Sequence, residues 1–369
     1  MSPPKSKPQT VRLLGELMAG AGEERMERVK EERFHSLELY ELVLEEAQAA
    51  LPFAPRRANE LATLGAELCV RLGTRGRLAP AAKSEGLARA LCLTATARRL
   101  MGHVETAEAL LERAQYLTLE AAGRGRFCRA LGLLRWDQGR TAEAAALLHH
   151  GLQLFGQAQN GKEEEACRAL LGLLYVEEGE TGWAAPLLRR AWRALERAGE
   201  AWLAVRSGLG LALCFAAAGE AAKARQARES AWRLYGGVRH EKALFALYWM
   251  EGRVAAGAGE VAAAEPLLEA VRRKLIARRL LPETTLATID LGLVLRELGR
   301  GGELSAPVEE LATRFAGRPG LDLALGALAI YAEDAAAGRL DRRQWSFLAP
   351  ELRRAFRLQG VRVSPVPFA

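Results

Sequence analysis

The chain has 369 residues, of which half are hydrophobic and 6% are aromatic, and its formal net charge is +7. Cationic and acidic residues are interspersed, which is typical of solvated helix faces and argues against a nucleic-acid-binding stripe. No apolar run approaches the roughly 20 residues that a membrane span needs, and the polar N-terminus has no secretion signal, so we expect a cytoplasmic protein that binds neither nucleic acid nor membrane.

Residues 1–80 predict a tail and a divergent helix pair. Residues 1–30 begin with a polar, proline-containing segment and continue into short helical patterns, so we expect a disordered tail and a short helix. Residues 31–80 form the divergent first repeat. Its two helices are predicted over residues 36–51 and 56–72, with prolines between them. The turn-rich segment 73–80 ends this region.

A glycine then recurs at an almost constant interval. It stands at Gly102, Gly139, Gly179, Gly219, Gly259, Gly299 and Gly338. Such a regular period is typical of a solenoid, and glycine suits the left-handed backbone at the end of a helix. We therefore predict an all-α fold, a right-handed α-solenoid of stacked antiparallel helix pairs, with its regular array over residues 81–338.

Small residues keep a fixed distance from these period glycines. Seven positions before the glycine stand Ala95, Gly132, Gly172, Ala212, Gly252 and Gly292; five positions after it stand Ala107, Ala144, Ala184, Ala224 and Ala264; and twelve positions after it stand Ala114, Gly151, Ala191, Ala231 and the larger Val271. Small side chains at these places let helix backbones approach closely, so we expect them in the packing between helices.

These residues resemble the tetratricopeptide repeat (TPR), whose signature places small residues around a glycine turn. The resemblance covers residues 84–315 and weakens in the sixth unit, where Leu304 replaces the small residue. The unit here is about 40 residues, longer than the roughly 34 residues of the usual repeat, and it lacks the early tryptophan and the terminal proline of the family. It is similar to longer-helix variants of bacterial regulatory and scaffold proteins.

The C-terminal region departs from the repeat. Arg343 and Pro350 occupy places where small residues would lie, so residues 339–369 are predicted to be capping helices and a tail. The last segment, residues 361–369, contains two prolines and is expected to be extended or flexible.

Nothing in the sequence indicates catalysis, a metal or a cofactor. The histidines form no HExxH or HxxxH pair, and the phosphate-loop, GxSxG and kinase motifs are absent. The five cysteines are widely spaced among apolar neighbours, which favours buried reduced thiols. We therefore expect a protein that is not an enzyme and has no cofactor.

The TPR resemblance implies that the first helix of each unit lines a ligand groove. Its ligand-facing positions include the candidate partner-binding residues Arg89, Arg99, Arg126, Arg129, Trp136, Arg206, Trp249, Arg253 and Arg296, and also Glu177, Leu213 and Leu293. Arginine can hold a carboxylate through two hydrogen bonds, and tryptophan can bury a large area. Under the alternative interpretation, the tryptophans are core residues and the arginines are solvated.

The function predicted from these observations is a non-catalytic protein–protein interaction scaffold or adaptor. Its groove would bind a peptide or partner protein that carries acidic and apolar side chains. The alternative is a regulatory sensor module for a signalling peptide or small ligand, working with a separate transcription regulator.

Overall fold

The computed structural model describes residues 8–74, 76–117, 119–236, 241–339, 342–361 and 363. Within these residues the protein consists of helices and connecting turns, with no strand, which confirms the predicted all-α class. The helices are α1 (Pro8–Met18), α2 (Gly22–Arg28), η1 (Glu32–Phe34), α3 (Leu37–Ala50), α4 (Pro55–Thr74), α5 (Pro80–Leu100), α6 (Val104–Gln115), α7 (Ala121–Asp137), α8 (Thr141–Gln157), α9 (Gly161–Glu177), α10 (Thr181–Arg197), α11 (Ala201–Ala217), α12 (Ala221–Tyr235), α13 (Glu241–Gly257), α14 (Val261–Ala277), α15 (Leu281–Glu297), η2 (Gly301–Leu304), α16 (Ser305–Arg314), α17 (Leu321–Ala336) and α18 (Arg342–Leu358).

The chain divides into two compact units, which are described separately. The N-terminal unit comprises Met1–Leu134 and Ala146–Glu164, and the C-terminal unit comprises Arg135–Ala145 and Glu165–Ala369. The domain boundaries predicted after residues 30, 80 and 338 remain predictions.

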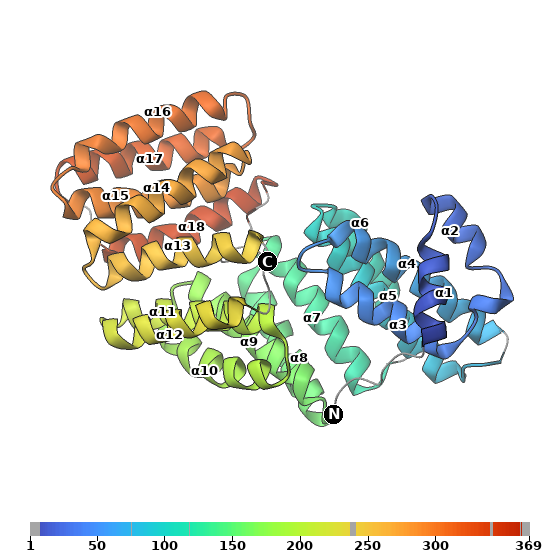
Figure 1. Ribbon diagram of the computed structural model, residues 1–369. Coiled ribbons are helices and arrows are strands. Elements are labelled where there is room, and N and C mark those ends of the chain that lie inside the picture. The colour runs from blue at the N-terminus through green and yellow to red at the C-terminus, as the bar shows by residue number, and fades with distance from the viewer. Residues whose placement is uncertain are drawn as a thin grey trace. The chain divides into compact units, whose positions relative to one another are not determined.

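Within each unit, helices pack against the helices that precede and follow them. Contacts join α3 through α6 in succession, and likewise α10 through α15. Alternate helices also meet, as α3 meets α5 and α11 meets α13. Figure 1 shows that successive helices run in opposite directions. This arrangement is a stack of antiparallel helix pairs, the α-solenoid predicted from the glycine period.

The small residues pack as predicted. A Cβ atom added at Gly172 would lie 2.8 Å from the side chain of Leu188, in the second helix of the same pair. The same distance separates a Cβ at Gly252 from Leu268. The alanines five positions after the period glycines are fully buried: Ala107, Ala144, Ala184, Ala224 and Ala264. A larger side chain at these places would force the helices of a pair apart.

The period glycines end the first helix of each pair. All seven have a positive φ, between +69° at Gly338 and +87° at Gly102. This left-handed conformation costs a residue with a Cβ about 1–2 kcal/mol, which explains why glycine recurs there. The turns between pairs use the same conformation at Gly199, but at Gln159 and Arg279 the left-handed residue is not glycine.

The N-terminal helices lie close to their predicted places. Helices α3 and α4 correspond to the helices predicted over residues 36–51 and 56–72; Pro52 lies between them, and Pro55 is the first residue of α4. Helix α1 begins at Pro8, which lies inside the segment predicted to be a tail, because proline is well suited to the first turn of a helix. Residues 1–7 lie outside the described residues. Apolar side chains of α1, α3, α4 and α5 share one core cluster.

The C-terminal helix α18 is amphipathic. Its apolar residues Ala349, Leu352 and Phe356 are buried in the core cluster that also contains residues of α13 to α17. Arg353 and Arg357 follow Leu352 and Phe356 by one residue, so they lie on an adjacent face of the helix. Of the segment predicted to be extended, residues 361–369, only residues 361 and 363 are described.

Candidate functional site

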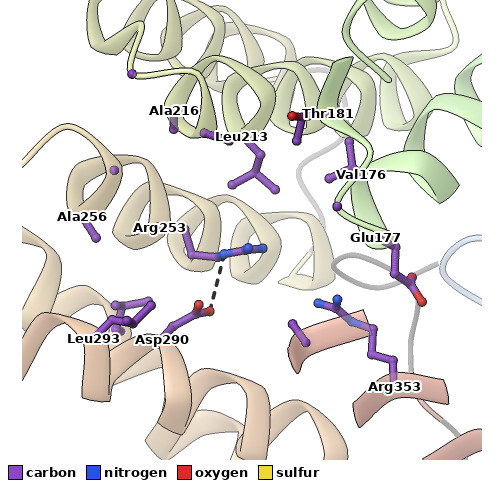
Figure 2. Close-up of a pocket in the computed structure, with 16 residues that line it drawn as sticks. Val176, Glu177, Thr181, Leu213, Ala216, Arg253, Ala256, Asp290, Leu293 and Arg353 are labelled. Carbon is purple, nitrogen blue, oxygen red and sulfur yellow. Dashed lines mark ion pairs between the residues drawn. The ribbon is translucent and has the colours of Figure 1, made fainter. Parts of the chain in front are cut away.

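A pocket of about 540 Å³ opens in the C-terminal unit (Figure 2). Its wall is formed by residues of α9, α10, α11, α13, α14, α15 and α18 and by the turns that follow α9 and α11: Val176, Glu177, Gly179, Thr181, Leu213, Ala216, Ala217, Gly219, Arg253, Ala256, Gly257, Leu268, Asp290, Leu293, Ala349 and Arg353. This volume lies within the roughly 300–1,000 Å³ that is usual for ligand pockets.

One carboxylate of the pocket, Asp290 on α15, is held by two residues of α13. The indole nitrogen of Trp249 donates a hydrogen bond of 2.9 Å to Asp290 Oδ2. The guanidinium nitrogen Nε of Arg253 lies 3.5 Å from the same oxygen. Trp249 and Arg253 are four residues apart and therefore share one face of α13. Figure 2 shows Arg253 and Asp290 facing each other across the pocket wall.

The other carboxylate, Glu177 at the end of α9, is bound by α18. Arg357 Nη1 lies 2.6 Å from Glu177 Oε1, and the side chains of this pair are 1% and 0% exposed. Burial alone would raise the pKa of Glu177, but the guanidinium groups of Arg357 and Arg353 outweigh it and hold this pKa below its ordinary value. The ion pair joins two helices that are far apart in the sequence.

A second ion pair between the same helices lies beside the first. Arg354 Nη2 is 3.4 Å from Glu178 Oε2. The pKa of Glu178 is raised, first by burial and then by the neighbouring charge of Glu177. Two consecutive acidic residues at the end of α9 therefore receive two arginines from α18, and this fixes how α18 lies along the pocket.

The remaining wall is apolar. Leu213 of α11 and Leu293 of α15 are 8% and 7% exposed, and Val176 extends the apolar surface toward Glu177. Alanine residues on α11 and α13 widen the space, and a Cβ at Gly257 would lie only 2.8 Å from Ala216. A ligand in this pocket would contact aliphatic side chains on one side and charged groups on the other.

The candidate groove arginines of the N-terminal unit take part in structural contacts. Arg89 pairs with Glu41, and Arg126 lies 3.8 Å from Glu85. Arg129 pairs with the largely buried Glu163. Arg99 is itself buried, at 4% exposure.

Burial raises the pKa of Glu163, while Arg129 and Arg126 lower it more strongly, so its pKa lies below the ordinary value. The arginines therefore stabilise this carboxylate within the fold. Their predicted role in binding a partner stays a prediction.

The candidates of the C-terminal unit separate into core and pocket residues. Trp136 is fully buried, and Arg206 and Trp249 are each 5% exposed. Arg296 lies 3.5 Å from the adjacent Glu297. Arg253 lines the pocket, together with the groove positions Glu177, Leu213 and Leu293. The alternative interpretation of the tryptophans as core residues agrees with their burial, although Trp249 also orients Asp290.

Sequence reasoning missed the arginines of α18. The resemblance to the repeat ends before this helix, so no groove position could be carried over to Arg353, Arg354 or Arg357. A signal was present, since Arg353 and Arg357 are spaced four residues apart beside the apolar positions of an amphipathic helix. What the sequence alone could not give is the partner of that basic face.

The described residues contain no cluster of three or more side chains with the composition of a metal site. Among the same residues, no helix combines the length and the apolarity required to cross a membrane. The pocket instead offers guanidinium groups, which bind carboxylates and phosphates, next to aliphatic surface.

No protein-family model matches the chain, and no curated protein matches its sequence. Similar solved structures exist. A Rap protein complexed with Competence and Sporulation Factor has a TM-score of 0.64 at 14% identity, with 85% of this chain and 87% of that chain covered.

Two structures of NprR are also similar. The apo quorum sensor NprR from B. thuringiensis has a TM-score of 0.57 at 13% identity, with 85% of this chain and 98% of that chain covered. NprR in complex with its cognate peptide NprX has a TM-score of 0.56 at 14% identity, with 85% and 88% covered. At such identities the likeness concerns the fold alone, and it agrees with the α-solenoid of stacked helix pairs described above.

Proposed function

We propose that this chain is a non-catalytic peptide-binding protein whose ligand site is the pocket of the C-terminal unit. The observation that carries the proposal is the pocket itself, which combines aliphatic walls with two arginines and two carboxylates. Ligand sites of proteins usually have this combination of an apolar lining and a few placed polar groups. Two similar solenoids, a Rap protein and NprR, are described as complexes with a factor and with a cognate peptide, which supports a peptide ligand here.

The chemistry of the pocket favours binding over catalysis. A general acid or base works best with a pKa near the operating pH, whereas the pKa of Glu177 is held below its ordinary value by Arg357 and Arg353, against the effect of burial. Asp290 is engaged by Trp249 and Arg253. The two carboxylates therefore hold the neighbouring arginines in place. Because arginine binds carboxylates, the ligand that we expect is a peptide with acidic and apolar groups.

Between an adaptor and a sensor, the position of α18 favours the sensor. Arg353 of this helix lines the pocket, and Arg354 and Arg357 bind the end of α9. A ligand that contacts Arg353 would act on α18, which also holds the end of α9 in place. Such coupling is what a regulatory module needs, because it converts binding into a change of α18. The regulator that would respond is proposed to be a separate protein.

The proposed setting is the cytoplasm. The five cysteines are buried and form no disulfide, which suits a reducing compartment.

Affinity selection tests the proposed function. The full-length chain is immobilised and exposed to a random octapeptide library, and the bound peptides are identified by mass spectrometry. Ala217→Trp fills the pocket rim from an exposed position, and Ala218→Trp places the same side chain at an exposed neighbour outside the pocket lining. We expect the first variant to bind the selected peptides at least about tenfold more weakly and the second to bind like the wild type.

Equal retention by all three proteins would exclude the pocket as the site. A wild-type chain that retains no peptide would exclude peptide binding itself. Circular dichroism and melting temperature confirm that both variants are folded, because each substitution stands at the end of α11 or just after it.

A further inference from the structure

Arg353 is a buried cation that points into the pocket. It is 7% exposed, and its Nε atom is buried without a hydrogen-bond partner. Among the described residues, no carboxylate lies within ion-pair distance of Arg353, whereas its neighbours on α18, Arg354 and Arg357, both have such partners. Figure 2 shows its side chain running from α18 toward the middle of the pocket, between Glu177 and the Arg253–Asp290 pair.

Both carboxylates near Arg353 already have another arginine beside them, although Glu177 Oε2 is itself buried without a hydrogen-bond partner. Glu177 is 2.6 Å from Arg357, and Asp290 receives the indole N–H of Trp249 and lies 3.5 Å from Arg253. Three guanidinium groups, those of Arg253, Arg353 and Arg357, therefore face two carboxylates. One positive charge remains uncompensated in a largely buried place.

The pKa of Arg353 agrees with an excess of positive charge around it. Burial lowers the pKa of Arg353, Arg253 and Arg357 lower it further, and Glu177 and Asp290 oppose them without restoring the ordinary value. An uncompensated buried charge costs several kcal/mol, so a protein retains one where a ligand of opposite charge will meet it or where another role requires it.

The surface next to this cation is aliphatic. Leu213, Leu293 and Val176 line the same pocket as Arg353 and Arg253. A ligand group that complements both the arginines and the aliphatic wall has a carboxylate within a few bonds of a branched aliphatic chain. Guanidinium groups suit a carboxylate because their planar donors match its two oxygens.

We propose that Arg353 and Arg253 together bind the carboxylate of the ligand, and that the aliphatic group beside that carboxylate contacts Leu213 and Leu293. This inference rests on the proposed peptide function and specifies the part of the peptide that the pocket recognises. That part is either a C-terminal carboxylate on an aliphatic residue or an acidic side chain next to one.

The first test uses a small probe that does not depend on peptide binding. 4-Methylpentanoate carries a carboxylate on the skeleton of leucine, and 4-methylpentanamide is its neutral match. Thermal shift and ligand-observed NMR are measured at constant ionic strength for the wild type, Arg353→Gln and Arg354→Gln. Arg354 is the matched control, since it stands next to Arg353, pairs with Glu178 and does not line the pocket.

We expect the carboxylate, but not the amide, to raise the melting temperature of the wild type and of Arg354→Gln. Arg353→Gln is expected to weaken binding about 10- to 100-fold. Arg253→Gln is expected to weaken it less, because Arg253 is shared with Asp290. Equal binding of acid and amide, an unchanged affinity in Arg353→Gln, or no binding of the acid to the wild type would each overturn the inference.

The same variant has a second readout without any ligand. If Arg353 carries an uncompensated charge, Arg353→Gln raises the melting temperature of the free protein, whereas Arg354→Gln lowers or preserves it. A structural role for Arg353 predicts the opposite sign, a lower melting temperature for Arg353→Gln, and this result would contradict the proposed charge imbalance.

The second test identifies the source of the carboxylate. Acetyl-Val-Leu is compared with acetyl-Val-Leu-amide, and acetyl-Glu-Leu-amide supplies the carboxylate from a side chain. Preference for the free C-terminus assigns a peptide end, and preference for the glutamate peptide assigns an acidic side chain.

The outcomes also distinguish this inference from the proposed function. If Ala217→Trp blocks octapeptide binding but Arg353→Gln does not, the carboxylate site is wrong and the proposed function stands. If 4-methylpentanoate binds through Arg353 while no peptide binds, the proposed function fails and the carboxylate site stands.

Discussion

At the scale of single residues, the turns between helix pairs are the clearest place where sequence and backbone disagree. Gln159, Gly199 and Arg279 occupy the same place in different repeats and all have positive φ, at 51°, 74° and 57°. Only Gly199 adopts this conformation without the cost that a Cβ imposes. The fold therefore imposes the left-handed turn even where the sequence lacks glycine.

This comparison yields a matched pair of substitutions. Gln159→Gly removes the strain of the left-handed backbone at an exposed position. Because glycine also raises the conformational entropy of the unfolded chain, we expect a net stabilisation of only about 0.5 kcal/mol. Gly199→Ala meets no atom within 4 Å of the new Cβ, so its cost is that of the backbone alone, about 1 kcal/mol. Urea unfolding monitored by circular dichroism measures both. A destabilising Gln159→Gly would show that this turn is not strained.

At the scale of elements, the contact between α9 and α18 includes one fully buried ion pair, that of Glu177 and Arg357. Removing one partner of such a pair generally costs about 3–5 kcal/mol, because the other charge is left buried. The two partners differ here, since Arg353 stands near Glu177 in addition to Arg357. Loss of Glu177 removes the ion-pair partner of Arg357, whereas after loss of Arg357 the charge of Arg353, which lies beyond ion-pair distance, still acts on Glu177.

We therefore predict an asymmetry. Glu177→Gln is expected to destabilise the protein by about 3–5 kcal/mol, and Arg357→Met by clearly less, although both remove the same ion pair of 2.6 Å. Chemical denaturation of each single variant, together with the double variant, measures the difference. Equal losses would mean that Arg353 does not stabilise Glu177 across the longer distance between them.

The same pair predicts how stability changes with pH. The native pKa of Glu177 lies below its ordinary value of 4.5 because Arg357 and Arg353 overcome the effect of burial. As the pH falls, the unfolded chain takes up this proton first, so the contribution of the pair is complete above about pH 4.5 and is lost below it. The stability difference between the wild type and Glu177→Gln should shrink between pH 5 and pH 3. Urea midpoints across this range measure it, and a constant difference would contradict the lowered pKa.

At the scale of the whole molecule, the repeat made the fold predictable and the site only partly so. The period glycines and the small residues follow from local geometry that every pair shares, so the sequence displays them repeatedly. Arg253 and Glu177 were found because the repeat assigns them to an inner face. Arg353 was not, because the other residues of its pocket lie on elements distant in sequence, and such proximity leaves no periodic trace.

Helix α18 also changes what the solenoid can do as a molecule. In a simple array each repeat contacts only its neighbours, and stability is a sum of local terms. Here the apolar face of α18 packs in the core cluster of α13 to α17, while Arg357 holds Glu177 of α9. Elements far apart in the sequence of the C-terminal unit are thereby joined, and their opening should be coupled.

A chain that ends at Arg339 tests this coupling. Without α18, the apolar partners of Leu352 and Phe356 become exposed and Glu177 loses Arg357, so we expect faster hydrogen exchange both in the end of α9 and in α17. Helices α4 and α5 of the N-terminal unit serve as the internal reference and should exchange as in the wild type. Mass spectrometry of peptic fragments measures all four helices. Faster exchange in α17 alone would show that α18 stabilises only the helices it packs against. The effect would then come from the lost apolar contacts, and the ion pair between Arg357 and Glu177 of α9 would not contribute.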